Sequence, residues 1–312
     1  MHTLIVGAGA VGGYIGARLH QSGRAPAFLV RPRRARILQQ RGLQLHTLAG
    51  TQIVQPRLLT PDAVDRHYDL ILLAVKATDL YTAIDAMRPA VGPDTLIVPI
   101  LNGMNHFPVL DGLFGRNAVL GGIAKVVTSL TDDGDIRQFA EGASLIIGKR
   151  AVGTDQVRFD RTAVTLDVDG IGFAVSEDID RDLWHKWVFI ASIGAANCLL
   201  GGTAGEIAAV AGGTEVATGL IEEAASISAA AGFPLDPSFI AEPFHDPASI
   251  LTSSMYRDVR NARRVEAESI VGDLVLSGRA LGVDVPLLNA AAVALRVWSN
   301  RRDKAEQQTS RE

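Results

Sequence analysis

A glycine-rich turn close to the start of the chain constrains the possible folds more than any other feature of this sequence. It consists of Gly7, Ala8, Gly9, Ala10, Val11 and Gly12. The turn follows a predicted strand, residues 3–6, and precedes a predicted helix with apolar side chains on one face. At such a junction, glycines at this spacing permit a tight turn, a close approach of pyrophosphate to the backbone, and close packing of helix on strand. The sequence therefore predicts a dinucleotide site at the N-terminus of this helix.

Strand-like and helical segments alternate in the first half of the chain. The predicted strands are residues 3–6, 27–30, 70–75, 96–99, 119–127 and 144–147. Such alternation predicts a mostly parallel sheet with helices on its faces. We therefore expect an α/β protein whose residues 1–172 form a Rossmann-type doubly wound domain.

The second half is predicted to be entirely helical, forming a substrate and catalytic domain over residues 173–312. The predicted helices are residues 180–200, 204–211, 214–231, 254–277 and 287–300, and the charged tail from residue 301 onward is expected to fray. The longest apolar stretch, residues 187–200, is too short for a membrane helix and is interpreted as a buried core helix.

Composition narrows the classes of partner and compartment. The 312 residues carry a net charge of -4, which gives no indication of a nucleic-acid or membrane partner. Cys198 is the only cysteine, so an internal disulfide is excluded, and no signal peptide precedes the first strand; both point to the cytoplasm. No metal site is expected, because the seven histidines are scattered. The apolar helices could serve either a homodimer or the core.

Arg31 follows the second predicted strand, where this fold meets the adenosine ribose. An acidic residue would accept hydrogen bonds from a ribose 2′-hydroxyl, whereas an arginine suits a 2′-phosphate. The expected cofactor is therefore NADP(H), with Arg33 or Arg34 in support. The alternative is that these arginines, with Arg36, form the solvated start of the next helix.

Two more polar residues follow predicted strands. Lys76 comes after residues 70–75, and Asn102 comes after residues 96–99. Because ligands bind at the carboxyl ends of parallel strands, both are placed to meet cofactor or substrate. The alternatives are a solvated strand end for Lys76 and a simple Asn-Gly turn for Asn102.

Five motifs in order resemble the ketopantoate reductase (2-dehydropantoate 2-reductase) family over nearly the whole chain. They are the glycine-rich turn, the segments around Lys76 and Asn102, residues 183–186 (Leu-Trp-His-Lys), and residues 253–259 (Ser-Ser-Met-Tyr-Arg-Asp-Val) followed by Glu266. Arg31 falls on the arginine with which the family binds the 2′-phosphate. The resemblance implies NADPH-dependent reduction of a 2-keto acid, with ketopantoate as the substrate and pantothenate biosynthesis as the pathway.

The resemblance also implies roles for single residues. Lys186 would protonate the ketone oxygen, and Glu266 would order the site; Asn102 would contact nicotinamide and substrate, and Ser254 would help to hold the substrate. An ammonium group suits the negative charge that develops on a ketone oxygen during reduction. On residue pattern alone, the preferred interpretation of Lys186 is a lysine at the edge of a helix, and Glu266 could be a surface charge on the same helix as Asp258.

Five positions depart from the family pattern: Val265 and Glu268 replace a threonine and an aspartate of the late motif, and the other three replace asparagines. Ile190, Gly194 and Ala204 stand where the family has asparagines, and Asn197 is the only nearby candidate to replace them. The predicted pocket is therefore more apolar, which weakens recognition of a hydroxylated keto acid. Two alternatives remain open: an NADPH reductase of the same fold that acts on a more apolar 2-oxo acid or carbonyl, and a non-catalytic NADP-binding regulatory protein.

Overall fold

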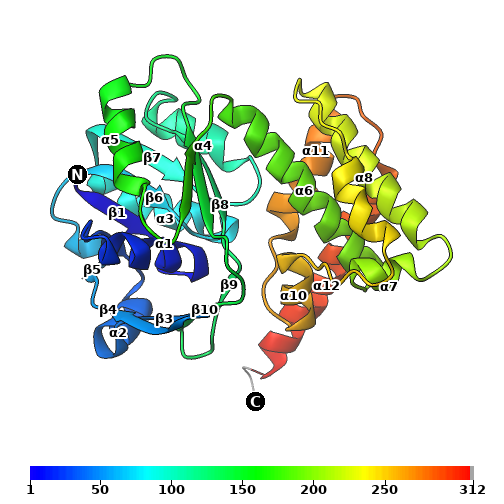
Figure 1. Cartoon of the computed structure of the whole chain (residues 1–312), viewed down its shortest axis with the longest axis horizontal. Coiled ribbons are helices and arrows are strands. Elements are labelled where there is room, and N and C mark those ends of the chain that lie inside the picture. Colours follow the sequence, from blue (N-terminus) through cyan, green and yellow to red (C-terminus); the bar gives the residue numbers. More distant parts are fainter. Residues whose placement is uncertain (310–312) are drawn as a thin grey trace. The chain divides into compact units, whose positions relative to one another are not determined.

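Five short apolar segments pair into one fully parallel sheet in the computed structural model, which describes residues 1–309. Its strands are β1 (Thr3–Val6), β2 (Ala27–Leu29), β5 (Arg57–Leu59), β6 (Tyr68–Leu73) and β7 (Val91–Pro99). They lie in the order β5-β2-β1-β6-β7, coloured blue to cyan in Figure 1. All four residues of β1 are buried, as expected for a central parallel strand covered on both faces.

Five helices belong to this part of the chain, and four of them come after strands of the parallel sheet while the last follows a strand of another sheet. They are α1 (Ala10–Gln21), α2 (Pro32–Arg41), α3 (Leu80–Met87), α4 (His106–Phe114) and α5 (Gln156–Leu166). Tyr14, Ile15 and Leu19 of α1 pack into the same buried cluster as the sheet residues Ile5 and Phe28. The helix is therefore fixed on the sheet by the apolar face that the sequence predicted.

Two smaller sheets complete this part of the chain. One has the order β4-β3-β10-β9 and the other β12-β11-β8. Their strands are β3 (Leu43–Thr47), β4 (Gly50–Val54), β8 (Gly121–Lys125), β9 (Thr128–Leu130), β10 (Ile136–Gln138), β11 (Ser144–Gly148) and β12 (Gly172–Val175). The strand expected at residues 119–127 is shorter than predicted. Only its central part, β8, pairs with β11, and the pairing is antiparallel.

The second half is helical, from green α6 to red α12 in Figure 1. Its helices are α6 (Ile179–Leu200), α7 (Ala204–Ala208), α8 (Gly213–Ala230), α9 (Ser238–Ala241), α10 (Ser254–Arg260), α11 (Asp273–Ala280) and α12 (Pro286–Thr309). A π-helical turn, Glu268–Gly272, leads directly into α11. The predicted fold class, an α/β domain followed by an all-helical domain, is confirmed.

The chain divides into two units inside α6, between Leu183 and Trp184 and so beyond the expected boundary at residue 172. The first unit holds Met1–Leu101 and His106–Leu183, and the second holds Asn102–Asn105 together with the chain from Trp184 onward. The short loop that contains Asn102 thus belongs to the helical unit. In the first unit, the Arg150 Nε lies 3.2 Å from Asp180 Oδ1, and this ion pair fixes the start of α6.

The single helix expected over residues 254–277 is wrong, because α10 ends at Arg260. Ala262 has a left-handed φ of 51°, and the Arg263 N–H donates to the Asp258 carbonyl. This hydrogen bond, which closes around the left-handed residue, is characteristic of a Schellman cap, and such a cap ends a helix. Asp258 and Glu266 therefore do not share a helix, contrary to the expectation from the sequence.

The tail from residue 301 onward was expected to fray, but α12 continues through it to Thr309. No glycine or proline interrupts residues 287–309. Arg302 pairs with Asp303 and with Glu306 one helical turn later, which supports an exposed helix. Residues 310–312 of the predicted tail lie outside the described residues.

Within residues 1–309, α6 alone has the length and apolar composition of a membrane-crossing helix, with a mean hydropathy of 1.2. Slightly more than half of its apolar window, 56%, is buried inside the protein. A core helix passes the same test, and α6 carries Trp187, Val188 and Ala191 into the core of the second unit.

Candidate active site

The glycine-rich turn has the geometry of a phosphate cradle. A Cβ atom at Gly12 would clash with the Gly7 carbonyl and lie 2.7 Å from Ala74 Cβ, so glycine is required where α1 packs on the sheet. Gly7 has a φ of 99°, a conformation that favours glycine. By contrast, a Cβ atom at Gly9 would meet nothing within 4 Å. Gly9 is also the N-cap of α1, without a side-chain cap, so open space lies beside N–H groups that can bind an anion.

Arg34 contacts this turn directly. Its Nε donates to the Ala8 carbonyl at 3.1 Å, and its Nη1 donates to the Gly134 carbonyl at 2.7 Å. Burial lowers the pKa of the Arg34 guanidinium. The sequence left Arg34 between a supporting role and a surface position, and the structure places it against the turn rather than in solvent.

Arg31 lies after β2 as the N-cap of α2, and its side chain is 64% exposed. Its Nη2 donates to Asp79 Oδ1 at 2.6 Å. Lys76, also exposed, lies between β6 and a short 3₁₀ turn that ends at Asp79. The structure therefore brings Arg31 beside an acidic residue that the sequence analysis did not consider.

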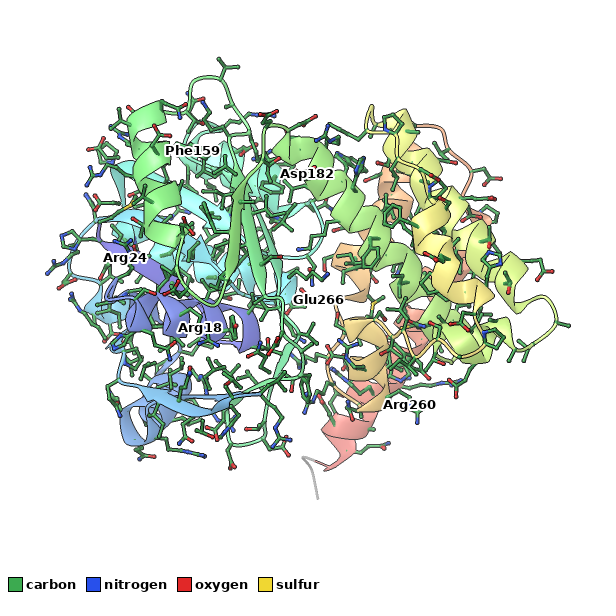
Figure 2. The ribbon with its side chains drawn as sticks, viewed as in Figure 1. Arg18, Arg24, Phe159, Asp182, Arg260 and Glu266 are labelled. Atoms are coloured by element: carbon green, nitrogen blue, oxygen red, sulfur yellow. The ribbon has the colours of Figure 1, made fainter. Side chains whose placement is uncertain are left out.

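The helical unit gathers three polar residues from distant parts of the chain. Asn102 lies in the short loop that this unit takes from the N-terminal half, Lys186 lies on α6, and Glu266, labelled in Figure 2, lies between α10 and the π-helical turn. The Asn102 Nδ2 donates to Glu266 Oε2 at 3.2 Å. Lys186 and Glu266 interact electrostatically.

Burial lowers the pKa of Lys186 to about 8, and the Glu266 carboxylate acts in the opposite direction by raising it. At neutral pH the amine is then mostly protonated yet gives up its proton more readily than an ordinary lysine, whose pKa lies near 10.4. A donor of this kind suits proton transfer to a carbonyl oxygen. The three residues thus combine a proton donor, a carboxylate that favours the charged form of that donor, and an amide that donates a hydrogen bond to the carboxylate.

The three positions where the family has asparagines are filled by apolar groups or buried. A Cβ atom at Gly194 would lie 2.5 Å from the Met255 methyl group, so Met255 occupies the space that a side chain at 194 would need. Ile190 packs on the edge of the helical core, and Ala204 is fully buried in it. Ser254 is exposed at the first position of α10. Met255 belongs to the motif at residues 253–259, but nothing in the sequence indicated that its side chain lies beside Gly194.

Asn197, the suggested replacement for the missing asparagines, has a structural role instead. It is fully buried. Its Nδ2 donates to the Gly202 carbonyl at 2.9 Å, and its Oδ1 accepts from the Ser253 N–H at 2.8 Å. The side chain fixes the end of α6 and the start of α10 and is not available to a substrate.

Replacing Asn197 by alanine is expected to lower the free energy of unfolding by about 2 to 4 kcal/mol, because it leaves two buried backbone groups without a partner. Urea unfolding measures this loss. The control is Asn300→Ala on the exposed face of α12, which should change stability by less than about 0.5 kcal/mol. A loss as small as that of the control would show that Asn197 does not hold these segments.

Over the same residues 1–309, no group of three or more histidine, cysteine, aspartate or glutamate side chains could hold a metal ion. Cys198 is partly buried, and burial raises the pKa of its thiol to about 12. The thiol is therefore a poor nucleophile at neutral pH.

Two family models match the chain. The model described as "Ketopantoate reductase PanE/ApbA" matches residues 3–151, and the model described as "Ketopantoate reductase PanE/ApbA C terminal" matches residues 178–298. Together they cover the parallel-sheet region and most of the helical region. The resemblance seen in the sequence motifs is confirmed.

Individual relatives agree with these matches. The chain is 31% identical to the "Uncharacterized oxidoreductase YkpB" of Bacillus subtilis, over 96% of this chain and 99% of the relative. It is 25% identical to a 2-dehydropantoate 2-reductase of Mesorhizobium japonicum, over 95% of this chain and 97% of the relative. A solved ketopantoate reductase of this family from Ralstonia eutropha superposes with a TM-score of 0.85 at 25% identity, covering 97% of this chain and all of that one.

Proposed function

The chain belongs to the ketopantoate reductase PanE/ApbA family of oxidoreductases, and on that premise we propose that it reduces a 2-keto acid to the 2-hydroxy acid with NADPH. The proposed substrate is 2-dehydropantoate, and the proposed role is pantothenate biosynthesis. The observation that carries this proposal is the grouping of Lys186, Glu266 and Asn102 in one unit, with the pKa of Lys186 lowered to about 8.

Each residue has one task in the proposed reaction. When bound, the reduced nicotinamide supplies a hydride to the carbonyl carbon. The Lys186 ammonium donates a proton to the carbonyl oxygen, so the ketone gains one hydride and one proton and becomes an alcohol. Glu266 favours the charged form of Lys186, and Asn102 holds the Glu266 carboxylate through its amide.

The first unit offers the groups that would hold the cofactor. The N–H groups at the start of α1, beside the open space at Gly9, suit the pyrophosphate. Arg31 suits a 2′-phosphate because only one of its amino groups is engaged, with Asp79. Asp79 itself could accept from the 2′-hydroxyl of NADH, so the cofactor preference requires a direct measurement.

A second candidate substrate is favoured by one observation. The Met255 methyl group fills the space beside Gly194. Ile190 lies one helical turn before Gly194 on α6. Apolar groups in these places suit a more apolar 2-oxo acid better than one with a hydroxyl group, which needs a polar partner.

The test is the initial rate of NADPH consumption by the purified protein with ketopantoate, α-ketoisovalerate, pyruvate and a bulkier 2-oxo acid, each repeated with NADH. We expect the highest kcat/KM with ketopantoate and NADPH. A preference for the bulkier acid would retain the reaction and replace the substrate. A preference for NADH would indicate that Asp79 binds the 2′-hydroxyl of the ribose. Binding of NADPH without turnover of any acid would contradict the catalytic proposal.

The compartment and the assembly state stay predictions. Because the sequence has a single cysteine and so forms no internal disulfide, it suits the reducing conditions of the cytoplasm. The expected partner is a small keto acid, and the apolar helices leave a homodimer and a monomer as the two alternatives for the assembly.

A further inference from the structure

A π-helical turn, Glu268–Gly272, begins two residues after Glu266 in the helical unit. Such turns are rare, and they occur frequently at functional sites. Their i→i+5 bonding interrupts the i→i+4 ladder of an α-helix, so backbone carbonyl groups are left to bond other partners. The partners of this turn are therefore informative.

One partner is the residue that follows Lys186. The indole Nε1 of Trp187 donates to the Ile270 carbonyl at 2.8 Å, and Trp187 is only 2% exposed. A buried indole N–H needs an acceptor, and a carbonyl in a widened turn needs a donor. The bond joins α6, next to Lys186, to the turn that follows Glu266.

A second partner is the residue that follows Asn102. Gly103 is buried with a φ of 81°, and a Cβ atom there would clash with the Ser269 carbonyl oxygen. The backbone next to Asn102 thus lies against the same turn. Close to Glu266, Ser269 Oγ donates to the Glu266 carbonyl at 3.3 Å.

A third contact holds the turn from its outer side. Glu268 accepts two hydrogen bonds from Arg296 of α12, each 2.7 Å long. The turn is therefore fixed to α12 while its inner carbonyls contact α6 and the Asn102 loop.

We propose that the π-helical turn Glu268–Gly272 is the positioning element of the active site, and that Trp187 is the positioning residue that sets Glu266 and Asn102 in register with Lys186. Each of the three polar residues is adjacent, or nearly adjacent, in sequence to a group that contacts this turn. The inference rests on the proposed function for its kinetic consequence, but its geometric consequence can be tested without any substrate.

The test is Trp187→Phe, which keeps a buried ring and removes the N–H donor. Without that donor the Ile270 carbonyl is unsatisfied, so the turn shifts and Glu266 moves relative to Lys186. Because the Glu266 carboxylate raises the Lys186 pKa, the pKa should fall when that carboxylate moves away. The matched control is Phe189→Leu on the same helix, which removes an aromatic ring that stacks on Phe239 with 6.5 Å between centroids.

Two readouts are compared. In the protein without cofactor or substrate, the rate at which acetic anhydride modifies Lys186 is followed by mass spectrometry against pH. The pH midpoint of this modification rate should fall by about half a pH unit or more in Trp187→Phe. With keto acid and NADPH, kcat should fall about 10- to 100-fold while KM changes less than about two-fold, as expected for displaced groups. Phe189→Leu should change neither.

The possible results separate the two proposals. An unchanged Lys186 midpoint and an unchanged kcat in Trp187→Phe would overturn the positioning role. If the parent protein reduces no keto acid, the proposed function fails, and the midpoint in cofactor-free protein still decides the positioning role. Should Trp187→Phe fail to fold, Gly103→Ala makes the same test, because its Cβ displaces Asn102 from the other side of the turn and should likewise lower the midpoint and kcat.

Discussion

Replacing Lys186 by alanine is expected to lower kcat for keto-acid reduction by about 1,000-fold, within the range attributed to a positioned general acid. Water would have to donate the proton in its place. Lys186 belongs to the helical unit, whereas the glycine-rich turn and Arg31 belong to the first. The Kd for NADPH, measured by the quenching of protein fluorescence, should therefore change less than about three-fold.

The pH dependence of the parent protein's reduction rate tests the same role of Lys186. The ammonium form of Lys186 is the proton donor, and its pKa is lowered to about 8. The reduction rate should therefore be high below pH 8 and fall as the pH rises through that value. In Lys186→Ala this limb should be absent, because the group that titrates there is gone.

The matched control is Lys149→Ala, which removes an exposed lysine bonded to Gln156. It should keep both the parent kcat and the limb near pH 8. If Lys186→Ala retained the parent kcat and the limb, another residue would be the acid and the proposed mechanism would be wrong. If Lys186→Ala and the parent were equally inactive while both bound NADPH, the non-catalytic NADP-binding hypothesis would be favoured.

The features that could be predicted from the sequence are those encoded by neighbours along the chain. The glycine-rich turn, β1 and α1 follow one another within 21 residues, and each is specified by its own residues. The same holds for α6 and α8, whose apolar periodicity is long and uninterrupted. Local patterns of this kind are strong enough to define the parallel sheet and the helical second half.

The features that could not be predicted depend on contacts between distant segments. The strands β3, β4, β5, β9 and β10 were not predicted, and each of them is stabilised by pairing with a neighbouring strand rather than by its own pattern. The break after α10 depends on a left-handed Ala262, a conformation that sequence rules assign to glycine or asparagine. Propensity gives no warning of such a cap.

The candidate site shows the same limit. The resemblance to the family indicated Lys186, Glu266 and Asn102, but the sequence offered no sign that Trp187 and Gly103 contact one turn. Its position along a helix made Asn197 the one nearby candidate for the missing asparagines, whereas its burial among backbone groups decides its role. Spacing gives the face of a helix, and only the packing shows what that face meets.

Replacing Gly9 by alanine is expected to raise the Kd for NADPH by about 10- to 100-fold while the fold is retained. A Cβ atom at Gly9 would enter open space beside the N-terminus of α1, and φ of -81° is compatible with alanine. The methyl group would hold the pyrophosphate away from the backbone N–H groups. Losing one charged hydrogen bond costs about 1.5 to 3 kcal/mol, which corresponds to the expected change in Kd.

The thermal midpoint separates this effect from a structural one. Alanine is a weaker N-cap than glycine, so Tm should fall by no more than about 3 °C. The control is Gly112→Ala on the exposed face of α4, where a Cβ also meets nothing within 4 Å; it should leave the Kd unchanged. An unchanged Kd in Gly9→Ala would mean that the phosphates do not bind at this turn. A collapse of Tm would instead mean that Gly9, like Gly12, is required by the packing of α1, because a cofactor contact adds nothing to the stability of the empty protein.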